Sequence, residues 1–171
     1  IEFKNIYDGS KFFMDPKLSM DIQQTLNSDI AMILDSLIDI NKEYDEQLNA
    51  INTTQQWANI ARNYHTNNNQ SLFGIVQGGK HKELREKSAT DMMTIDFDGY
   101  AIGGLAIGET PEERKEIVNF TVEMLPKDKL RYVMGLGDIE GMLELIELGV
   151  DIFDCVWPAR LARHGKIINK G

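Results

Sequence analysis

Cysteine is almost absent from the sequence, since Cys155 is the only one among 171 residues. A single cysteine excludes an internal disulfide and a Cys-x-x-Cys metal site, and it fits a reducing, cytoplasmic setting. No apolar run reaches the roughly 18 residues that a membrane helix needs, and no signal-peptide pattern follows Ile1. We therefore expect a protein without a membrane partner. A first residue that is Ile rather than Met suggests a piece of a longer chain.

Positive charge is also in deficit, because 18 basic residues face 27 acidic ones and leave a formal net charge of −9. This balance argues against a surface that binds nucleic acid over its whole extent. The charge is uneven, however: residues 157–171 contain no acid and carry Arg160, Arg163, Lys166 and Lys170. This basic end is either a solvated tail or a local contact for phosphate groups.

Hydrophobic residues make up 42% of the chain, enough for a real core in one domain or in part of one. Asp8-Gly9, between alternating apolar residues, predicts a hairpin near the start. Asp15-Pro16 and Thr110-Pro111 predict capped helix starts. The full pattern predicts strands at 29–35, 72–77, 99–104, 131–135 and 150–156, helices at 16–27, 53–65, 79–95, 111–125 and 138–148, and a long loop over 36–52.

Strands that alternate with helices predict a parallel sheet with helices outside it, and therefore an α/β fold. The chain holds about five such strand–helix units. Intervals of about 20 to 40 residues between strands are compatible with an incomplete (β/α)8 TIM-type barrel and equally with an open doubly wound sheet. The pattern of elements leaves both architectures open.

Groups suited to binding lie where the predicted strands end. They are Asp35, Gln77 with Gly78-Gly79, Gly103-Gly104, Met134-Gly135 and Asp154. Both parallel architectures gather such groups at the carboxyl edge of the sheet. Each group has an ordinary alternative: the glycine pairs are tight turns, Asp35 caps the next segment, and Met134 belongs to the core. Their coincidence at successive strand ends favours one shared binding mouth.

Asp35, Gln77 and the Gly103-Gly104 backbone complement the edge of a guanine-like ring. A carboxylate can accept two parallel N–H bonds, which guanine offers from its ring N–H and its exocyclic amine. An amide side chain or a glycine N–H can bind the carbonyl oxygen of the same base. Pterins and xanthines present similar edges, so the residues alone leave these ligands open.

Asp154 interrupts an apolar run that extends from Val150 to Val156. Burying an unpaired carboxylate is costly, so a carboxylate in such a run calls for a functional explanation. An ionised carboxylate can attack the anomeric carbon of a sugar, and a second attack from the vacated face restores the stereochemistry, as in retaining glycosidases. Arg160 and Arg163 follow at once and are candidates to bind neighbouring phosphates or to balance the charge of Asp154.

Four ordered motifs carry a family resemblance that extends over essentially the whole chain. They are "LFGIVQGG" (72–79), "FDGYAIGGLAIGE" (97–109), "YVMGLGD" (132–138) and "GVDIFDCVWPARLARHG" (149–165). Together they resemble the tRNA-guanine transglycosylases, or queuine tRNA-ribosyltransferases. The resemblance implies a modified (β/α)8 barrel and an enzyme that exchanges guanine at the wobble position of a tRNA anticodon for a 7-deazaguanine base.

The resemblance also implies a role for individual residues. Asp154 is the expected nucleophile, and Arg160 and Arg163 are expected to contact RNA. The residues expected to bind the base are Asp35, Gln77, Gly104, Leu105 and, by stacking, Met134. Glu109, Tyr132 and Gly135 are expected to surround the pocket.

The chain departs from the family pattern after the base-binding Asp35, where Ser36 and Leu37 replace a typical Glu-Cys pair. Ile107 is bulky where queuine users have a small residue, which favours the small base preQ1 over queuine. The family's other active-site aspartate and its zinc site lie outside residues 1–171. We therefore expect one part of a catalytic barrel domain that lacks N-terminal strands and a C-terminal zinc subdomain.

Several expectations follow from this placement. The fragment alone should be inactive, and the full-length protein should form a homodimer and contain zinc. This chain should hold no cofactor and no metal, because His65, His81 and His164 form no ligand pattern.

Two other classes of function stay open. One is a non-catalytic, tRNA-binding scaffold subunit of a transglycosylase. The other is an unrelated barrel that binds a purine or a phosphate in its "GGLAIGE" loop. The spacing from Gly103-Gly104 to Gly108 does not match the dinucleotide-binding fingerprint, which argues against a Rossmann dehydrogenase.

Overall fold

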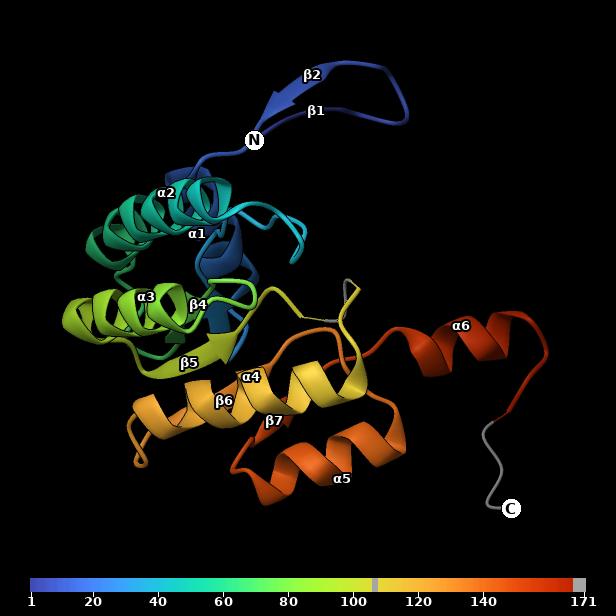
Figure 1. Cartoon of the computed structure of the whole chain (residues 1–171). Coiled ribbons are helices and arrows are strands. Elements are labelled where there is room, and N and C mark those ends of the chain that lie inside the picture. Colours follow the sequence, from blue (N-terminus) through green and yellow to red (C-terminus); the bar gives the residue numbers. More distant parts are fainter. Residues whose placement is uncertain (106–107, 168–171) are drawn as a thin grey trace.

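The computed structural model describes residues 1–105 and 108–167 of the chain. An antiparallel hairpin comes first, made of β1 (Glu2–Lys4) and β2 (Lys11–Phe13). The strands of one parallel sheet then alternate with helices (Figure 1). In chain order these elements are α1 (Pro16–Leu26), β3 (Ile30–Met32), α2 (Tyr44–Tyr64), β4 (Ser71–Val76), α3 (Lys82–Ile95), β5 (Gly99–Ile102), α4 (Pro111–Met124), β6 (Leu130–Val133), α5 (Ile139–Glu147), β7 (Ile152–Phe153) and α6 (Trp157–Arg163).

The order of the strands in the sheet decides between the two predicted architectures. The five strands pair in the order β3-β4-β5-β6-β7, and every pair is parallel. A doubly wound sheet reverses its order at a switch point, whereas a barrel adds each new strand on the same side. The incomplete TIM-type barrel is therefore confirmed, and the doubly wound sheet is wrong. Among the described strands, β3 and β7 each have one neighbour.

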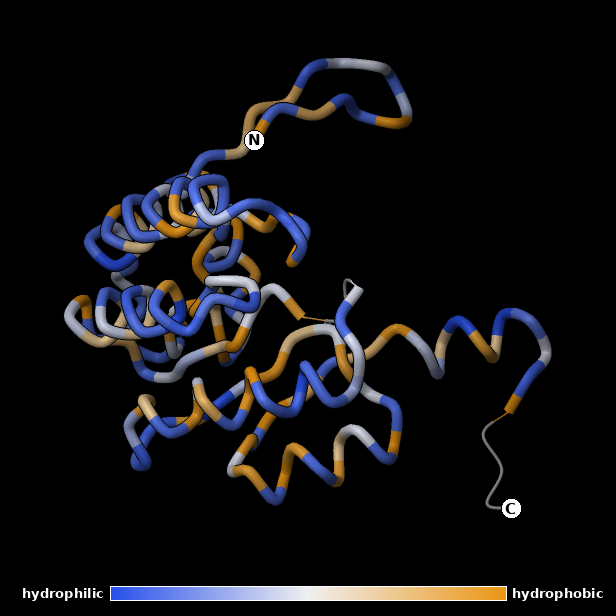
Figure 2. The backbone as a smooth tube through the Cα atoms, viewed as in Figure 1, coloured by the Kyte–Doolittle hydropathy of each residue, from blue (hydrophilic) through white to orange (hydrophobic). Residues whose placement is uncertain are grey.

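The helices lie together because of this order. Right-handed crossovers between successive parallel strands place their helices on the same face of the sheet. In agreement, α1 contacts α2, α2 contacts α3, α3 contacts α4, and α4 contacts α5. Hydrophobic and hydrophilic residues alternate along these helices (Figure 2), as expected of helices that bury one side.

The core fills the space between helices and strands. The strands contribute Leu72, Val76, Tyr100, Ile102 and Val133, and the helices contribute small or flexible side chains such as Ala58, Ala61, Ala89 and Met92. Alanines let the helix backbones approach the sheet closely, since they add little volume between the layers. Most of these side chains are completely buried, so the register of the strands is held firmly.

The register of β4 and β5 places the later site residues side by side. Phe73 pairs with Gly99 and Ile75 with Ala101, so these four residues share one face of the sheet. A Cβ atom on Gly99 would lie 2.4 Å from the Phe73 ring, which explains a glycine inside this strand. The same alternation, continued past the strand ends, brings Gln77 next to residue 103.

The predicted helix starts are confirmed at their caps. The Asp15 carboxylate accepts a hydrogen bond from the Leu18 N–H at 2.9 Å. Thr110 and Glu113 form a reciprocal capping box at the start of α4. Short side-chain acceptors at these positions satisfy N–H groups that have no partner within the helix, so such starts are readable from sequence.

Two predicted segments differ from the structure. α2 begins at Tyr44, so the loop predicted over 36–52 is wrong for its second half. The buried residues of this added stretch, Gln47, Ala50 and Ile51, recur at helical spacing together with Thr54 after it. Polar residues around them make that helical period hard to recognise in the sequence.

The basic end also contains the helix α6, whose residues are largely exposed and which extends away from the sheet (Figure 1).

The strands are shorter than predicted, and their ends change the place of two candidate residues. β3 ends at Met32, so Asp35 lies in the loop that follows it. The prediction that Asp35 might cap the next segment is wrong, because Glu43 precedes α2. β7 ends at Phe153, directly before Asp154. β6 turns away after Val133, which is the last partner for β7, so Asp154 has no strand to pair with.

The amino-terminal hairpin is confirmed and stands apart from the helix and sheet layers (Figure 1). Its Phe3 and Phe12 rings contact each other, with centroids 5.0 Å apart. Across the described ranges, no helix combines the length and the apolar character needed to cross a lipid bilayer.

Candidate active site

The loops at the carboxyl edge of the parallel sheet hold two groups of polar residues. One group follows β3, β4 and β5 and contains Asp35, Gln77 and Gly104. The other follows β6 and β7 and contains Gly135 and Asp154. Because the five strands run in the same direction, all of these residues lie at one edge, as the sequence predicts.

Hydrogen bonds hold both the backbone and the side chain of Gln77. Its backbone N–H donates to the Ser88 hydroxyl of α3 at 3.0 Å, and its side chain is 5% exposed. The side-chain amide donates from Nε2 to Oδ2 of Asp35. Burial raises the pKa of the Asp35 carboxyl, and the hydrogen bond from Gln77 opposes this effect only in part. The pair therefore joins a fixed amide to a carboxyl group whose charge is costly.

The two glycines after β5 lie against Gln77. A Cβ atom on Gly103 would lie 2.6 Å from Nε2 of Gln77, and one on Gly104 would lie 2.6 Å from its Oε1. Gly104 also has a φ of +70°, in the left-handed region. Leu105, which follows, is 5% exposed. Glycine is therefore required here for close packing on the amide as well as for the turn.

Asp154 is exposed, so the expectation that it is a buried carboxylate is wrong. Its Oδ1 accepts from the Tyr132 hydroxyl at 2.6 Å and from the Gly135 N–H at 2.7 Å. Burial and the bond to Asp154 raise the pKa of Tyr132 well above its usual value, so the phenol stays protonated and can donate at neutral pH. Within residues 1–105 and 108–167, no hydrogen bond reaches Oδ2 of Asp154.

The remaining predicted site residues are Met134, Glu109, Arg160 and Arg163. Met134 is half-buried and packs against the core near the mouth, which fits both stacking and the ordinary core role. Glu109 is half-buried, and its charge partly opposes the lowering of the pKa of Arg85 on α3 by burial. Arg160 and Arg163 are exposed on α6, and none of their side chains joins the hydrogen bonds of Asp154.

The residues expected to affect base preference are placed in part. The Ser36 N–H donates to the Thr54 hydroxyl of α2 at 2.9 Å, which fixes the loop after Asp35. Leu37 is 56% exposed beside it. Ile107 lies outside the described residues.

Sequence reasoning missed Arg85 and Ser88, which lie on the side of α3 that faces the sheet. Both are almost fully buried together with Leu84, Ala89 and Met92. An arginine inside an otherwise apolar helix face was the available signal, because arginine is almost never fully buried unless it is paired.

No zinc site fits the described residues. None of them form a group of three or more His, Cys, Asp or Glu side chains that could hold a metal ion. A structural zinc site needs four such ligands close together.

The geometry suits two tasks at one edge. The Asp35 carboxylate and the Gln77 amide offer acceptors and a donor to a planar heterocycle. Asp154 offers an oxygen for attack on a carbon atom while Tyr132 and Gly135 hold the other oxygen in place.

The raised pKa of Asp35 predicts how stability changes with pH. A carboxyl whose pKa is raised on folding favours the protonated form, so its contribution is fully present at low pH and is lost as pH rises through the folded-state pKa. Asp35→Asn keeps an acceptor for Gln77 and removes the charge. In the full-length protein we expect a higher Tm than wild type at pH 7 and no difference near about pH 3.

Thermal unfolding at both pH values measures this effect. Asp39→Asn, at an exposed position of the same loop, is the control for the loss of one negative charge. A lower Tm for Asp35→Asn at pH 7 than for Asp39→Asn would contradict the argument that burial dominates at Asp35.

Comparison of the sequence with known proteins points to one family. A sequence model of the family described as Queuine tRNA-ribosyltransferase matches residues 1–171. The chain is 47% identical over 165 residues to the Queuine tRNA-ribosyltransferase of Thermotoga petrophila, which covers 96% of the chain and 45% of that relative. The protein of the same name from Bacillus subtilis is 43% identical over 168 residues, covering 98% and 44%.

The chain thus spans less than half the length of these curated relatives. A match along the whole chain also excludes the unrelated purine- or phosphate-binding barrel. The chain belongs to the queuine tRNA-ribosyltransferase family.

Proposed function

We propose that residues 1–171 are part of one catalytic barrel domain of a tRNA-guanine transglycosylase. The observation that carries this proposal is that Asp154, bound by Tyr132 and Gly135, lies at the same edge of the sheet as the Asp35–Gln77 pair. The first group suits covalent capture of a ribose, and the second suits a purine-like base. A non-catalytic scaffold subunit would need neither, so the retained carboxylates favour an enzyme.

The proposed reaction has two displacements. Oδ2 of Asp154 attacks C1′ of the wobble nucleotide, the bond between C1′ and the guanine nitrogen breaks, and the ribose becomes an ester of the aspartate. The incoming base then attacks C1′ from the face that guanine left, and the ester breaks, so the configuration is retained. Tyr132 and Gly135 keep Oδ1 occupied by donors and thereby orient Oδ2.

The polar residues that follow β3, β4 and β5 recognise the base. Asp35 accepts from the ring N–H and the exocyclic amine, while Gln77 and the Gly104–Leu105 backbone bind the carbonyl side. Met134 covers one face of the ring. The preferred incoming base is a 7-deazaguanine of the preQ1 type rather than queuine, supported by bulky Ile107 in the sequence.

The substrate is tRNA, and Arg160 and Arg163 contact its phosphates. Both side chains are exposed on α6, in a stretch without acidic residues. RNA affinity depends largely on such cationic contacts. We further propose that the full-length protein is a cytoplasmic homodimer that holds zinc outside this chain.

Asp154→Asn should abolish the covalent protein–RNA adduct in the full-length protein, because an amide oxygen is a poor nucleophile. The adduct is trapped with a base analogue and separated on a denaturing gel. Asp151→Asn is the matched control, since Asp151 binds the Arg131 N–H at the opposite end of β7. An adduct of normal yield from Asp154→Asn would overturn the assignment, and no adduct from wild type would favour the scaffold subunit.

Tyr132→Phe should slow base exchange in the full-length protein, because Asp154 loses one of two donors. A hydrogen bond to a charged group contributes about 1.5–3 kcal/mol, which corresponds to roughly tenfold to hundredfold in rate. Steady-state kinetics measure the effect on kcat. Tyr100→Phe removes a hydroxyl from the helix-facing side of β5 and should leave kcat near wild type. Equal kcat values for both variants would show that the Tyr132 hydroxyl is dispensable.

Residues 1–171 alone should exchange no guanine and should bind tRNA weakly. The family's second active-site aspartate, which would handle the protons of leaving and entering bases, lies outside this stretch. So does the zinc-bearing segment that helps to hold tRNA. Guanine exchange by the purified chain is measured with the full-length protein as control. Turnover comparable to the control would show that the active site is complete within these residues.

A further inference from the structure

Arg85 is the largest of the side chains that are almost completely buried, with 1% of its surface exposed. Burial lowers the pKa of its guanidinium to about 10, while the charge of Glu109 acts in the opposite direction. The group is therefore still protonated at neutral pH. A buried charge is destabilising unless its hydrogen bonds compensate for lost hydration, so Arg85 needs an explanation beyond packing.

Three hydrogen bonds of Arg85 go to backbone carbonyls around the proposed base pocket. Nε donates to the Gly79 oxygen at 2.9 Å, and Nη2 donates to the Gly103 oxygen at 3.1 Å. A longer bond of 3.5 Å joins Nη1 to the Val76 oxygen. Val76 and Gly79 flank Gln77, and Gly103 precedes Gly104. One guanidinium thus bridges the loop after β4 and the loop after β5.

We propose that Arg85 is a positioning residue that holds the Gln77 loop and the Gly103–Gly104 loop at the spacing that base recognition requires. This inference rests on the proposed function, because it concerns the same pocket. Arg85 acts through the carbonyl groups it binds and through the packing of Gln77.

The packing around the glycines supports this role. A Cβ atom on Gly78 would lie 2.7 Å from the Arg85 backbone nitrogen, so the loop lies directly on the start of α3. Glycines 103 and 104 in turn contact the Gln77 amide, as described above. A shift of the guanidinium would therefore move the amide that is expected to bind the base, because no free space separates these groups.

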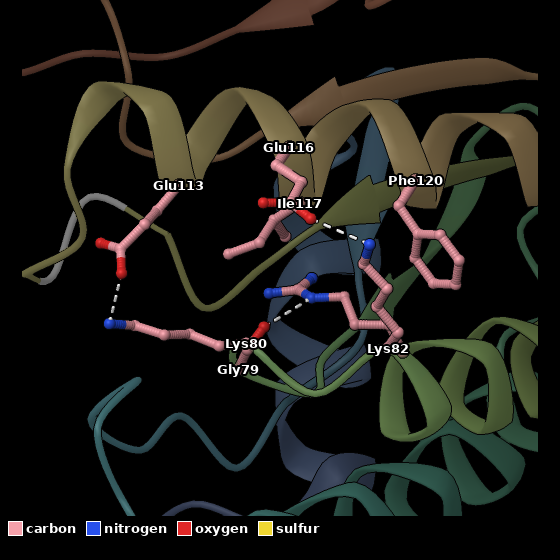
Figure 3. A pocket seen from close by; sticks show the side chains of 8 residues that line it. Gly79, Lys80, Lys82, Glu113, Glu116, Ile117 and Phe120 are labelled. Carbon is pink, nitrogen blue, oxygen red and sulfur yellow. Dashed lines mark hydrogen bonds and ion pairs between the residues drawn. The ribbon is translucent and has the colours of Figure 1, made fainter.

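Exposed ion pairs also contact the outer side of the same loop and the start of α3. Figure 3 shows the cleft between the start of α3 and α4, with Ile117 and Phe120 on its wall. Its volume is about 140 Å³. Two ion pairs span this cleft. Lys80 pairs with Glu113 at 2.8 Å, and Lys82 pairs with Glu116 at 2.9 Å. Exposed ion pairs of this kind stabilise weakly. The Gly103 N–H also donates to the Val76 oxygen at 3.0 Å, and Arg85 adds a buried side-chain bridge that tethers the two loops.

Arginine suits this position better than lysine. Its planar guanidinium presents N–H groups in several fixed directions, whereas a lysine ammonium is a single point of charge on a flexible stem. Arg85→Lys keeps the positive charge and loses the bridge between the Gly79 and Gly103 carbonyls. This variant therefore separates the effect of losing the bridge from the effect of losing the positive charge.

Arg131 offers a matched control at the opposite edge of the sheet. It is 9% exposed, and its guanidinium donates to the carbonyls of Leu125 at 3.0 Å and Gly149 at 3.4 Å. Both carbonyls lie in loops that precede strands, on the amino side of the sheet. Arg131→Lys thus removes the same chemistry from a place remote from the pocket.

The test compares Arg85→Lys and Arg131→Lys in the full-length protein. Both should lower Tm. Arg85→Lys should raise the KM for the base roughly tenfold to hundredfold, the loss expected for hydrogen bonds made by a charged group. The KM for tRNA should stay within about twofold, because RNA affinity depends largely on cationic contacts to phosphate. A uniform loss of fold would instead affect the KM for both substrates. Arg131→Lys should change neither KM. Equal changes in base KM for the two variants, or none for Arg85→Lys, would overturn the proposal.

A second measurement requires no activity. Amide hydrogen exchange should be faster in the peptides that cover 77–81 and 103–105 in Arg85→Lys, and unchanged there in Arg131→Lys. Unchanged exchange in Arg85→Lys would contradict the tether. If Arg85→Lys speeds amide hydrogen exchange but the full-length wild-type protein does not exchange guanine, the tether stands and the proposed function is refuted. The two failures are therefore distinguishable.

Discussion

Parallel pairing of successive strands is the constraint on which the rest of the structure depends. Each strand from β3 to β7 adds to the same side of the sheet and points the same way. Residues far apart in the chain, such as Asp35 and Asp154, therefore meet at one edge without any contact between their own strands. Right-handed crossovers place the covering helices on one face and leave the carboxyl-edge loops to form the site.

Two ionisable groups whose charged forms are destabilised by burial lie at that edge. Asp35 has a pKa raised by burial, and Arg85 keeps its charge although it is buried. Neither arrangement is required by the core, which is built from hydrophobic residues. Arg131 shows that a buried arginine can also close loops at the amino edge. What distinguishes Arg85 is that the carbonyls it binds belong to the loops of the proposed base pocket.

Much of this could be predicted from sequence, and the failures have physical causes. Alternating apolar runs predicted the parallel sheet, and short polar acceptors such as Asp15 and Thr110 predicted helix starts. Asp154 was expected to be buried because its neighbours are apolar, but β7 ends one residue earlier, when β6 turns away. Where a strand ends depends on its neighbour, which local sequence does not encode. The bond from Tyr132 to Asp154 and the bridge by Arg85 join segments far apart in sequence, so no local pattern predicts them.

A crystal structure of the full-length protein with guanine bound tests the account most directly. The account predicts the ring between Met134 and the Gly104–Leu105 backbone, with its ring N–H and exocyclic amine on Asp35 and its carbonyl oxygen on Gln77. Oδ1 of Asp154 should still bind Tyr132 and Gly135. Guanine bound elsewhere, for example in the cleft between α3 and α4, with Asp35 and Gln77 still bonded only to each other, would contradict it.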